Sequence, residues 1–187
     1  MRNRILRFAK GVKLPIDVLM STIALLGNKS SGKTYGGKKL FEAAHALGVQ
    51  CIALEPIGKW FGLRLHKDGR QPGLKDVYIF GGKHADFPLR VDMGAFIAKL
   101  LVERHVHAIL DVSLMRKAER RRFVTDFVEE FHLLKKQEDV PHPCVLFLEE
   151  AHAFAPQTVR DEEARMLGAV EDVVREGRNA GIGIVLM

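Results

Sequence analysis

GNKSSGKT, at residues 27–34, is the stretch that decides the fold of this chain. An apolar run precedes it at residues 22–26 and a segment with helical periodicity follows it, which is the context of a phosphate-binding loop. Gly27 and Gly32 allow the backbone to curl so that its N–H groups point inward and bind an anion at the positive end of the helix. The motif predicts that the chain binds a nucleoside triphosphate, the alternative being a plain glycine-rich turn.

The residues of this loop are predicted to contact the nucleotide and its metal ion. Lys33 is expected to reach the β- and γ-phosphates and so to act in catalysis, and the Thr34 hydroxyl is expected to coordinate Mg²⁺. The predicted cofactor contacts are Gly27, Asn28, Lys29, Ser30, Ser31, Gly32, Lys33, Thr34 and Tyr35.

The composition is that of a globular domain. The chain has 187 residues, of which 47% are hydrophobic, so we expect one domain with one buried core over residues 1–187. No apolar run approaches the ~20 residues that cross a bilayer, and the start lacks a secretory signal, so we expect no membrane contact and a cytoplasmic location. Cys51 and Cys144 lie in apolar runs, where buried thiols are expected rather than a disulfide.

The formal net charge of +6 favours a polyanionic partner. Two basic clusters could touch phosphates, but the solvated face of a helix explains each of them equally well. The clusters are Arg2, Arg4, Arg7, Lys10 and Lys13 near the start, and Arg116, Lys117, Arg120, Arg121 and Arg122 later.

Apolar runs and helical patterns alternate along the chain. Most of the apolar runs are continuous, as expected for strands that are covered on both faces. The order predicts right-handed crossovers and a three-layer α/β fold of the P-loop NTPase type, with a mostly parallel central sheet. Phe123, Phe127 and Phe131 are expected to be plain core. The predicted strands are residues 22–26, 49–54, 77–80, 106–112, 145–148 and 182–187, and the predicted helices are residues 33–47, 119–136 and about 162–177.

Two segments depart from this alternation. Residues 62–88 are rich in glycine and proline around one short strand, which predicts an inserted hairpin or loop. GIGIVLM, at residues 181–187, is typical of a central strand, and no turn residue or cap follows it. We therefore expect a domain that is truncated and a sheet that is incomplete at its C-terminal side.

VLFLEEAH, at residues 145–152, ends an apolar strand in two carboxylates. We expect this strand to lie beside the loop-bearing strand, with its acids at the carboxyl edge of the sheet, where open α/β sheets bind ligands. Glu149 is then placed to hold Mg²⁺, and Glu150 to orient and deprotonate the attacking water. The alternatives are two plain exposed glutamates, and Asp111 at another strand end as the metal-binding acid.

At least two other strands lie between the loop and Glu149 in the sequence. This order favours the RecA-like (ASCE) division of ATPases, with an extra central strand and a catalytic glutamate, over nucleotide kinases and simpler GTPases. We interpret His152 as a link between the acid pair and the next loop. A zinc site is not expected, because no pair has the spacing of zinc ligands among His105, His107, His142 and Cys144.

Five segments carry a resemblance to a known family. They are VLFLEEAHAFAP (145–156), VVREGRNAGIGIVLM (173–187), LPIDVLMSTIALLGNKSSGKT (14–34), LEPIGKWFGLR (54–64) and FGGKHADFPL (80–89). The first two resemble the HerA–FtsK group of hexameric DNA-pumping ATPases, especially the HerA-like ATP-binding proteins. The other three are similar to the bacterial members of that group. The resemblance covers nearly the whole chain.

The resemblance implies a helicase- or translocase-type ATPase that binds ATP and Mg²⁺ and works as a homo-oligomeric ring, a hexamer, on double-stranded DNA. A nuclease is an implied further partner. Arg175 or Arg178 is the implied arginine finger, which reaches the γ-phosphate of a neighbouring subunit; for Arg178 the alternative is a cation at a helix C-terminus. A secretion- or conjugation-type ATPase that acts on protein, and a nucleotide-binding module without turnover, remain alternatives.

The chain departs from the family pattern in several places. Glu149 stands where the family commonly has Asp, which moves the carboxylate outward by one methylene. The acid at the end of the second strand is Glu55, but the lysine that often follows two residues later is Ile57. A glutamine after the final strand and the N-terminal barrel of archaeal members are both absent from the sequence.

Overall fold

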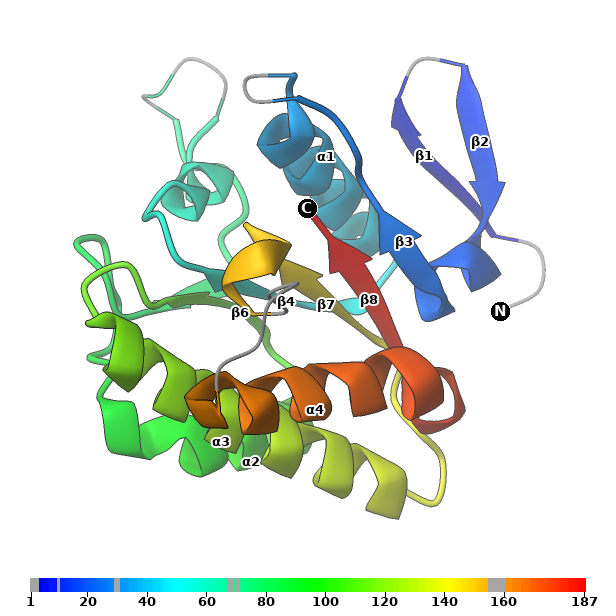
Figure 1. Ribbon diagram of the computed structural model, residues 1–187. Helices are drawn as coiled ribbons and strands as arrows, with labels where there is room; N and C mark the ends of the chain where they lie inside the picture. Colours follow the sequence, from blue (N-terminus) through cyan, green and yellow to red (C-terminus); the bar gives the residue numbers. More distant parts are fainter. Residues whose placement is uncertain (1–3, 10, 29–30, 67–68, 70, 155–160) are drawn as a thin grey trace.

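The computed structural model describes residues 4–9, 11–28, 31–66, 69, 71–154 and 161–187. Within these residues, six parallel strands form one central sheet with helices on both faces, which confirms the predicted three-layer α/β fold of the P-loop NTPase type (Figure 1). The strands, in order across the sheet, are β3 (Thr22–Ala24), β8 (Ile182–Leu186), β7 (Cys144–Leu148), β4 (Gln50–Glu55), β6 (His107–Asp111) and β5 (Val77–Phe80).

Different helices cover the two faces of the sheet, as Figure 1 shows. The helix that follows the glycine-rich loop lies on one face, with two short 3-10 helices, and three helices that pack on one another lie on the opposite face. The first face carries α1 (Lys33–Ala46), η1 (Ile16–Met20) and η2 (Trp60–Arg64); the second carries α2 (Gly94–Arg104), α3 (Lys117–Gln137) and α4 (Asp161–Glu176).

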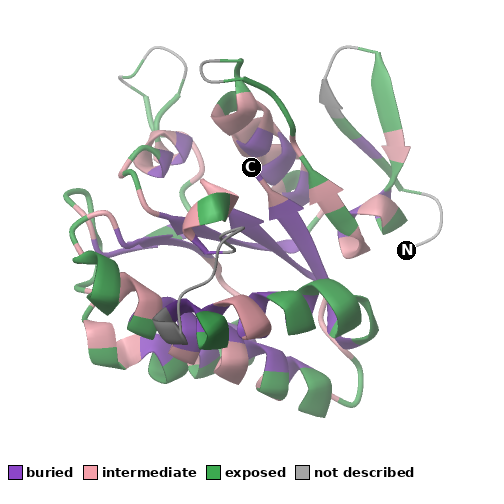
Figure 2. Ribbon diagram, viewed as in Figure 1, coloured by how far each residue is buried: buried purple, intermediate pink, exposed green. Residues whose placement is uncertain are grey.

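Each central strand sends alternate side chains into two separate apolar cores, because successive residues of a strand point to opposite faces. In β4, Ile52 and Leu54 pack toward α2 and α3, whereas Cys51 and Ala53 pack toward α1. The strands are accordingly the most continuously buried part of the chain (Figure 2). Cys51 is a buried free thiol, as predicted, and so is Cys144.

The helices follow the predicted pattern and include one that the pattern did not predict. Phe123, Phe127 and Phe131 of α3 are fully buried and stack on one another, so their prediction as core is confirmed. α2 is the additional helix, and its buried residues include Ile97 and Leu101 at helical spacing. Among the described residues, none of the helices has the length and apolar character that crossing a bilayer requires.

β8 lies inside the sheet, paired with β3 on one side and with β7 on the other. The prediction that the acid-bearing strand β7 lies beside β3 is therefore wrong, because β8 separates them. Gly183 allows β8 to pack closely against η1 at this position, because a Cβ atom there would lie 1.6 Å from the backbone oxygen of Leu19 in η1. Incompleteness of the sheet at its C-terminal side stays a prediction.

Residues 62–88 contribute a strand to the central sheet. Leu65 and Pro72 form an antiparallel bridge, and the chain then enters β5, which is the outermost strand and runs parallel to β6. After β5, Asp86 accepts a hydrogen bond from the backbone of Ile79 at 2.8 Å and so holds the returning loop. The description of this segment as an insertion stays a prediction.

The described members of the N-terminal basic cluster, Arg4, Arg7 and Lys13, lie in or next to a hairpin and not on a helix. β1 (Ile5–Ala9) pairs antiparallel with β2 (Val12–Pro15), and β1 packs on α1. Arg4 donates a hydrogen bond to a carbonyl at the end of α1, at 2.8 Å. In the second cluster, Lys117 pairs with Glu163 of α4 at 3.2 Å. In both clusters, therefore, at least one basic side chain makes a polar contact within the fold.

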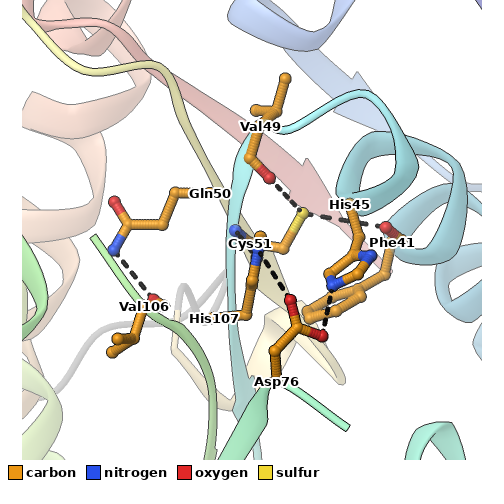
Figure 3. Close-up of polar contacts among 8 residues, drawn as sticks. All are labelled: Phe41, His45, Val49, Gln50, Cys51, Asp76, Val106 and His107. Carbon is orange, nitrogen blue, oxygen red and sulfur yellow. Dashed lines mark hydrogen bonds and ion pairs between the residues drawn. The ribbon is translucent and has the colours of Figure 1, made fainter. Parts of the chain in front are cut away.

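His45, Asp76 and His107 form a polar cluster at the amino edge of the sheet, where the end of α1 meets the starts of β5 and β6 (Figure 3). Asp76 Oδ1 lies 2.8 Å from His45 Nε2, and Asp76 Oδ2 lies 4.0 Å from His107 Nε2. His107 Nδ1 accepts a hydrogen bond from the backbone N–H of Cys51 at 3.1 Å, so the neutral ring carries its proton on Nε2. A metal ion would need the lone pair of that nitrogen, and we therefore interpret the cluster as hydrogen-bonded rather than metal-binding.

Acidification should destabilise the fold through His107. Burial, with a contribution from His45, lowers the pKa of His107 to about 4 from an ordinary value of 6.5, although Asp76 opposes the shift. Between these two pH values the unfolded chain binds more protons at this residue than the folded chain, so stability is lost as the pH falls. We expect the unfolding temperature to drop between pH 7 and pH 5, and to drop less in the variant His107→Gln.

Other groups titrate in the same direction, because burial also lowers the pKa of His132 and of His142. The comparison of the two proteins removes their contribution, since both retain these residues. Equal drops in wild type and His107→Gln, measured by thermal unfolding, would show that His107 does not carry the effect.

Candidate functional site

The glycine-rich loop connects β3 to α1 at the carboxyl edge of the sheet (Figure 1). Gly32 is the N-cap of α1 and has φ 90°, a left-handed backbone that suits glycine. The end of the loop and the first turn of α1, on either side of Gly32, both border the same cavity. The backbone N–H groups at this helix start are therefore available to an anion.

Lys33, the first residue of α1, folds back over the loop. Its ammonium group donates hydrogen bonds to the backbone oxygen of Gly27 at 2.7 Å and to that of Asn28 at 3.4 Å. A bound phosphate would compete with these carbonyls for the ammonium group. A Cβ atom at Gly27 would lie 2.3 Å from the Ser31 hydroxyl oxygen, so a larger residue there would require the Ser31 side chain to turn away.

Thr34 and Glu149 join the start of α1 to the end of β7. The Thr34 hydroxyl donates a hydrogen bond to Glu149 Oε1, and the indole Nε1 of Trp60 donates to Glu149 Oε2 at 3.3 Å. Glu149 is almost completely buried. A hydroxyl and a carboxylate side by side are hard oxygen donors of the kind that Mg²⁺ prefers, so this pair fits the predicted metal ion.

Glu150 occupies an unusual backbone position. Its φ is 53°, which is left-handed and uncommon for a residue with a side chain. Its carboxylate is half exposed and lies 3.3 Å from His152 Nδ1. The chain directly after it is anchored, since the N–H of Ala151 donates to the backbone oxygen of Met187 at 2.7 Å.

These residues surround one cavity of about 620 Å³. The loop and the start of α1 form one wall, the end of β7 a second and the turn after β4 a third. The described lining residues are Asn28, Ser31, Gly32, Lys33, Thr34, Ile57, Lys59, Glu149, Glu150 and Met187.

The cavity thus contains most, but not all, of the residues predicted for the site. Gly27 and Tyr35 are not among its lining residues. Tyr35 is 67% exposed, and the Lys39 ammonium lies 5.7 Å from the centroid of its ring. Lys29 and Ser30 lie outside the described residues. Ile57 and Lys59 belong to the site without having been predicted, although the turn signals Pro56 and Gly58 precede them.

Asp111, the rival metal-binding acid, lies away from this cavity. It ends β6, accepts a hydrogen bond from the backbone N–H of Ser113 at 2.9 Å and lines a separate cavity of about 340 Å³. A Cβ atom at Gly82 would lie 1.9 Å from Asp111 Oδ2, so this carboxylate is packed against backbone. Of the two acids, Glu149 is the one in contact with Thr34.

Glu55 organises the turn that forms the third wall of the cavity. Its carboxylate is completely buried at the end of β4 and accepts hydrogen bonds from three successive backbone N–H groups. Burial raises the pKa of Glu55, and Asp111, its register partner on β6, adds to the rise. The donors are Ile57 at 2.9 Å, Gly58 at 2.6 Å and Lys59 at 3.0 Å.

A lysine of α1 fixes the same turn from the other side. Lys38 Nζ donates a hydrogen bond to the backbone oxygen of Lys59 at 2.6 Å. Burial lowers the pKa of Lys38, while the nearby carboxylates of Glu55 and Glu149 oppose the shift. The turn between β4 and η2 is therefore held by a buried acid beneath it and by a half-buried base beside it.

Arg175 and Arg178 lie at the opposite edge of the sheet. Arg175 lies in the last turn of α4 and pairs with Glu171 at 3.2 Å, and Arg178 lies in the short helix η5 (Gly177–Ala180) just before β8. The cavity begins at the other end of β8, so the strand's five residues, at about 3.3 Å each, separate them by roughly 17 Å. Neither arginine lines the cavity of its own chain.

Comparisons with known proteins give little beyond this geometry. No model of a protein family matches the chain, and no curated protein matches it. Among solved structures, it is similar to the pCW3 conjugation coupling protein TcpA, in the monomer form with ATPγS, at 15% sequence identity and a TM-score of 0.46. The match covers 98% of this chain and 47% of that one, so the chain spans about half the length of that protein.

Proposed function

We propose that the chain is the ATP-binding, Mg²⁺-dependent ATP-hydrolysing motor domain of a HerA-like translocase that acts on double-stranded DNA. The contact between Thr34 and Glu149 carries this proposal, because it joins a hydroxyl and a carboxylate in the cavity that Lys33 and Glu150 also line. A plain glycine-rich turn would need neither acid.

The residues of the cavity have different roles in binding the nucleotide and its metal ion. The N–H groups at the start of α1 bind the phosphates, and Lys33 moves from the loop carbonyls to the β- and γ-phosphates. Thr34 and Glu149 hold Mg²⁺, which when bound neutralises charge on the phosphates. Trp60 keeps Glu149 oriented through the hydrogen bond to its second oxygen.

Glu150 is the proposed general base. Its carboxylate is half exposed and lines the cavity next to Glu149, so a water molecule can reach it. It orients that water and accepts its proton, a task worth about 10² to 10⁴ in rate when a positioned side chain performs it. His152 Nδ1 lies 3.3 Å from this carboxylate, close enough to donate a hydrogen bond to it.

The placement of the two candidate arginine fingers supports the proposed ring. Arg175 and Arg178 lie at the edge of the sheet opposite the cavity, so either would act on a nucleotide bound by a neighbouring subunit. This supports catalysis that is completed only between subunits, and the sequence resemblance implies that the assembly is a hexamer.

Lys33→Ala and Glu150→Gln should separate binding from turnover. Lys33→Ala removes a charge-assisted contact and should weaken ATP binding about 10-fold or more. Glu150→Gln keeps the shape of the side chain but cannot accept the proton, so binding should persist while turnover falls at least about 10²-fold. Calorimetric titration and phosphate release measure the two effects.

The matched controls are Lys99→Ala and Glu103→Gln, an ion pair on the exposed side of α2. Both should behave as wild type. Normal hydrolysis by Glu150→Gln would show that another group is the base. Tight ATP binding without phosphate release in the wild type, even at high protein concentration, would instead favour a nucleotide-binding module without turnover.

Trp60 gives an optical readout of the metal site. It is the single tryptophan in the chain, and its indole N–H donates to Glu149. Addition of Mg²⁺ to the ATP-bound protein should change its fluorescence, because Glu149 then shares its charge with the metal ion. In Glu149→Gln the Mg²⁺-dependent change should be lost, whereas an identical change in the variant would argue against Glu149 as a metal ligand.

Duplex DNA should stimulate hydrolysis, and the stimulation should depend on salt. Contacts to phosphates release counterions, so DNA affinity falls steeply as the salt concentration rises. We expect clear stimulation at roughly 50 mM salt and little stimulation at roughly 200 mM salt. Hydrolysis that is indifferent to DNA at low salt would favour the secretion- or conjugation-type alternative with a protein substrate.

A further inference from the structure

Lys59 supplies a positive charge to the nucleotide cavity that no described side chain neutralises. It lies on the turn after β4, is exposed and lines the cavity together with Lys33. Among the described residues, its ammonium group forms no hydrogen bond or ion pair, whereas the Lys33 ammonium group is held by loop carbonyls. A free ammonium group at the wall of an anion site is available to a ligand.

The charges of the cavity favour such a group. Its described lining contains two acids, Glu149 and Glu150, and two bases, Lys33 and Lys59. Without Lys59 the acids would outnumber the bases in a site that must accept a triphosphate. With Lys59 the formal charges of the described lining balance.

The backbone of Lys59 is fixed on both of its polar groups. Its N–H donates to the buried carboxylate of Glu55, and its carbonyl oxygen accepts a hydrogen bond from Lys38. Gly58, just before it, has φ 81°, a backbone conformation that residues with side chains rarely adopt. These two hydrogen bonds hold the backbone of Lys59 at the cavity wall, so that its flexible charged side chain starts from a fixed point there.

The sheet order indicates which phosphate Lys59 meets. β4 lies on the side of β7 away from the loop-bearing strand β3, so the turn after β4 faces the acids of β7 and not the start of the loop. The terminal phosphate is the part of ATP that lies next to those acids, because the attacking water has to be placed there.

We propose that Lys59 is a second phosphate-binding cation, which contacts the γ-phosphate, and that Glu55 is the residue that positions it. The proposal rests on the proposed function, because it assumes ATP in this cavity. It makes the chain discriminate ATP from ADP, since ADP lacks the group that Lys59 binds.

The test compares a nonhydrolysable ATP analogue with ADP, both with Mg²⁺, by calorimetric titration. Lys59→Ala should weaken binding of the analogue about 10-fold or more while ADP affinity changes less than about 2-fold. Lys59→Arg keeps the charge and should retain most of the affinity. The matched control is Lys83→Ala, an exposed lysine that lines a different cavity.

Glu55→Gln tests the positioning residue without removing a charge from the cavity wall. It retains one acceptor oxygen for the three N–H groups of the turn and should reproduce the loss for the analogue, again sparing ADP. Equal losses for both nucleotides would show a merely structural role and would overturn the positioning by Glu55.

Unchanged affinity of Lys59→Ala for the analogue, with Lys33→Ala impaired for both nucleotides, would overturn the inference and leave the proposed function intact. Wild type that binds neither nucleotide would overturn both. Thermal unfolding of each variant checks that it is folded at the temperature of the titration.

Discussion

The hydrogen bond between Thr34 and Glu149 is the constraint on which the rest of the site depends. It ties the first turn of α1 to the end of β7 across the intervening strand β8. Glu149 is buried, so an oxygen without a donor there would cost about 1–3 kcal/mol. The start of α1 is thereby held at one distance from the acids, and the cavity between them has a defined width.

Three neighbouring strands end in a buried acid, and their surroundings give these acids different tasks. Glu149 directly after β7 meets side-chain donors, Glu55 at the end of β4 meets the backbone of the turn that follows it, and Asp111 at the end of β6 is packed against glycine backbone. Of the three, Glu149 is the acid that a side chain of α1 hydrogen-bonds, through the Thr34 hydroxyl. The position of each strand relative to the glycine-rich loop, rather than the type of residue, therefore decides which carboxylate can hold a metal ion.

Most of the architecture could be predicted from the sequence, because continuous apolar runs and glycine punctuation act locally. The loop, α1 and the six strands all follow from such signals. The order of the strands could not be predicted: β8 separates β3 from β7 through long-range packing that depends on Gly183 fitting against η1. The position of Lys59 could not be predicted for a similar reason, since it depends on the hydrogen bonds that Glu55 accepts from the backbone of the turn.

The left-handed backbone of Glu150 sets stability against activity at a single position. A side chain at φ 53° costs about 1 kcal/mol or more that glycine would not incur. Selection for thermal resistance alone would therefore favour glycine at this position and would discard the carboxylate. A stabilised variant with Gly in place of Glu150 would be expected to retain its fold and its phosphate cradle while losing the ability to complete a cycle.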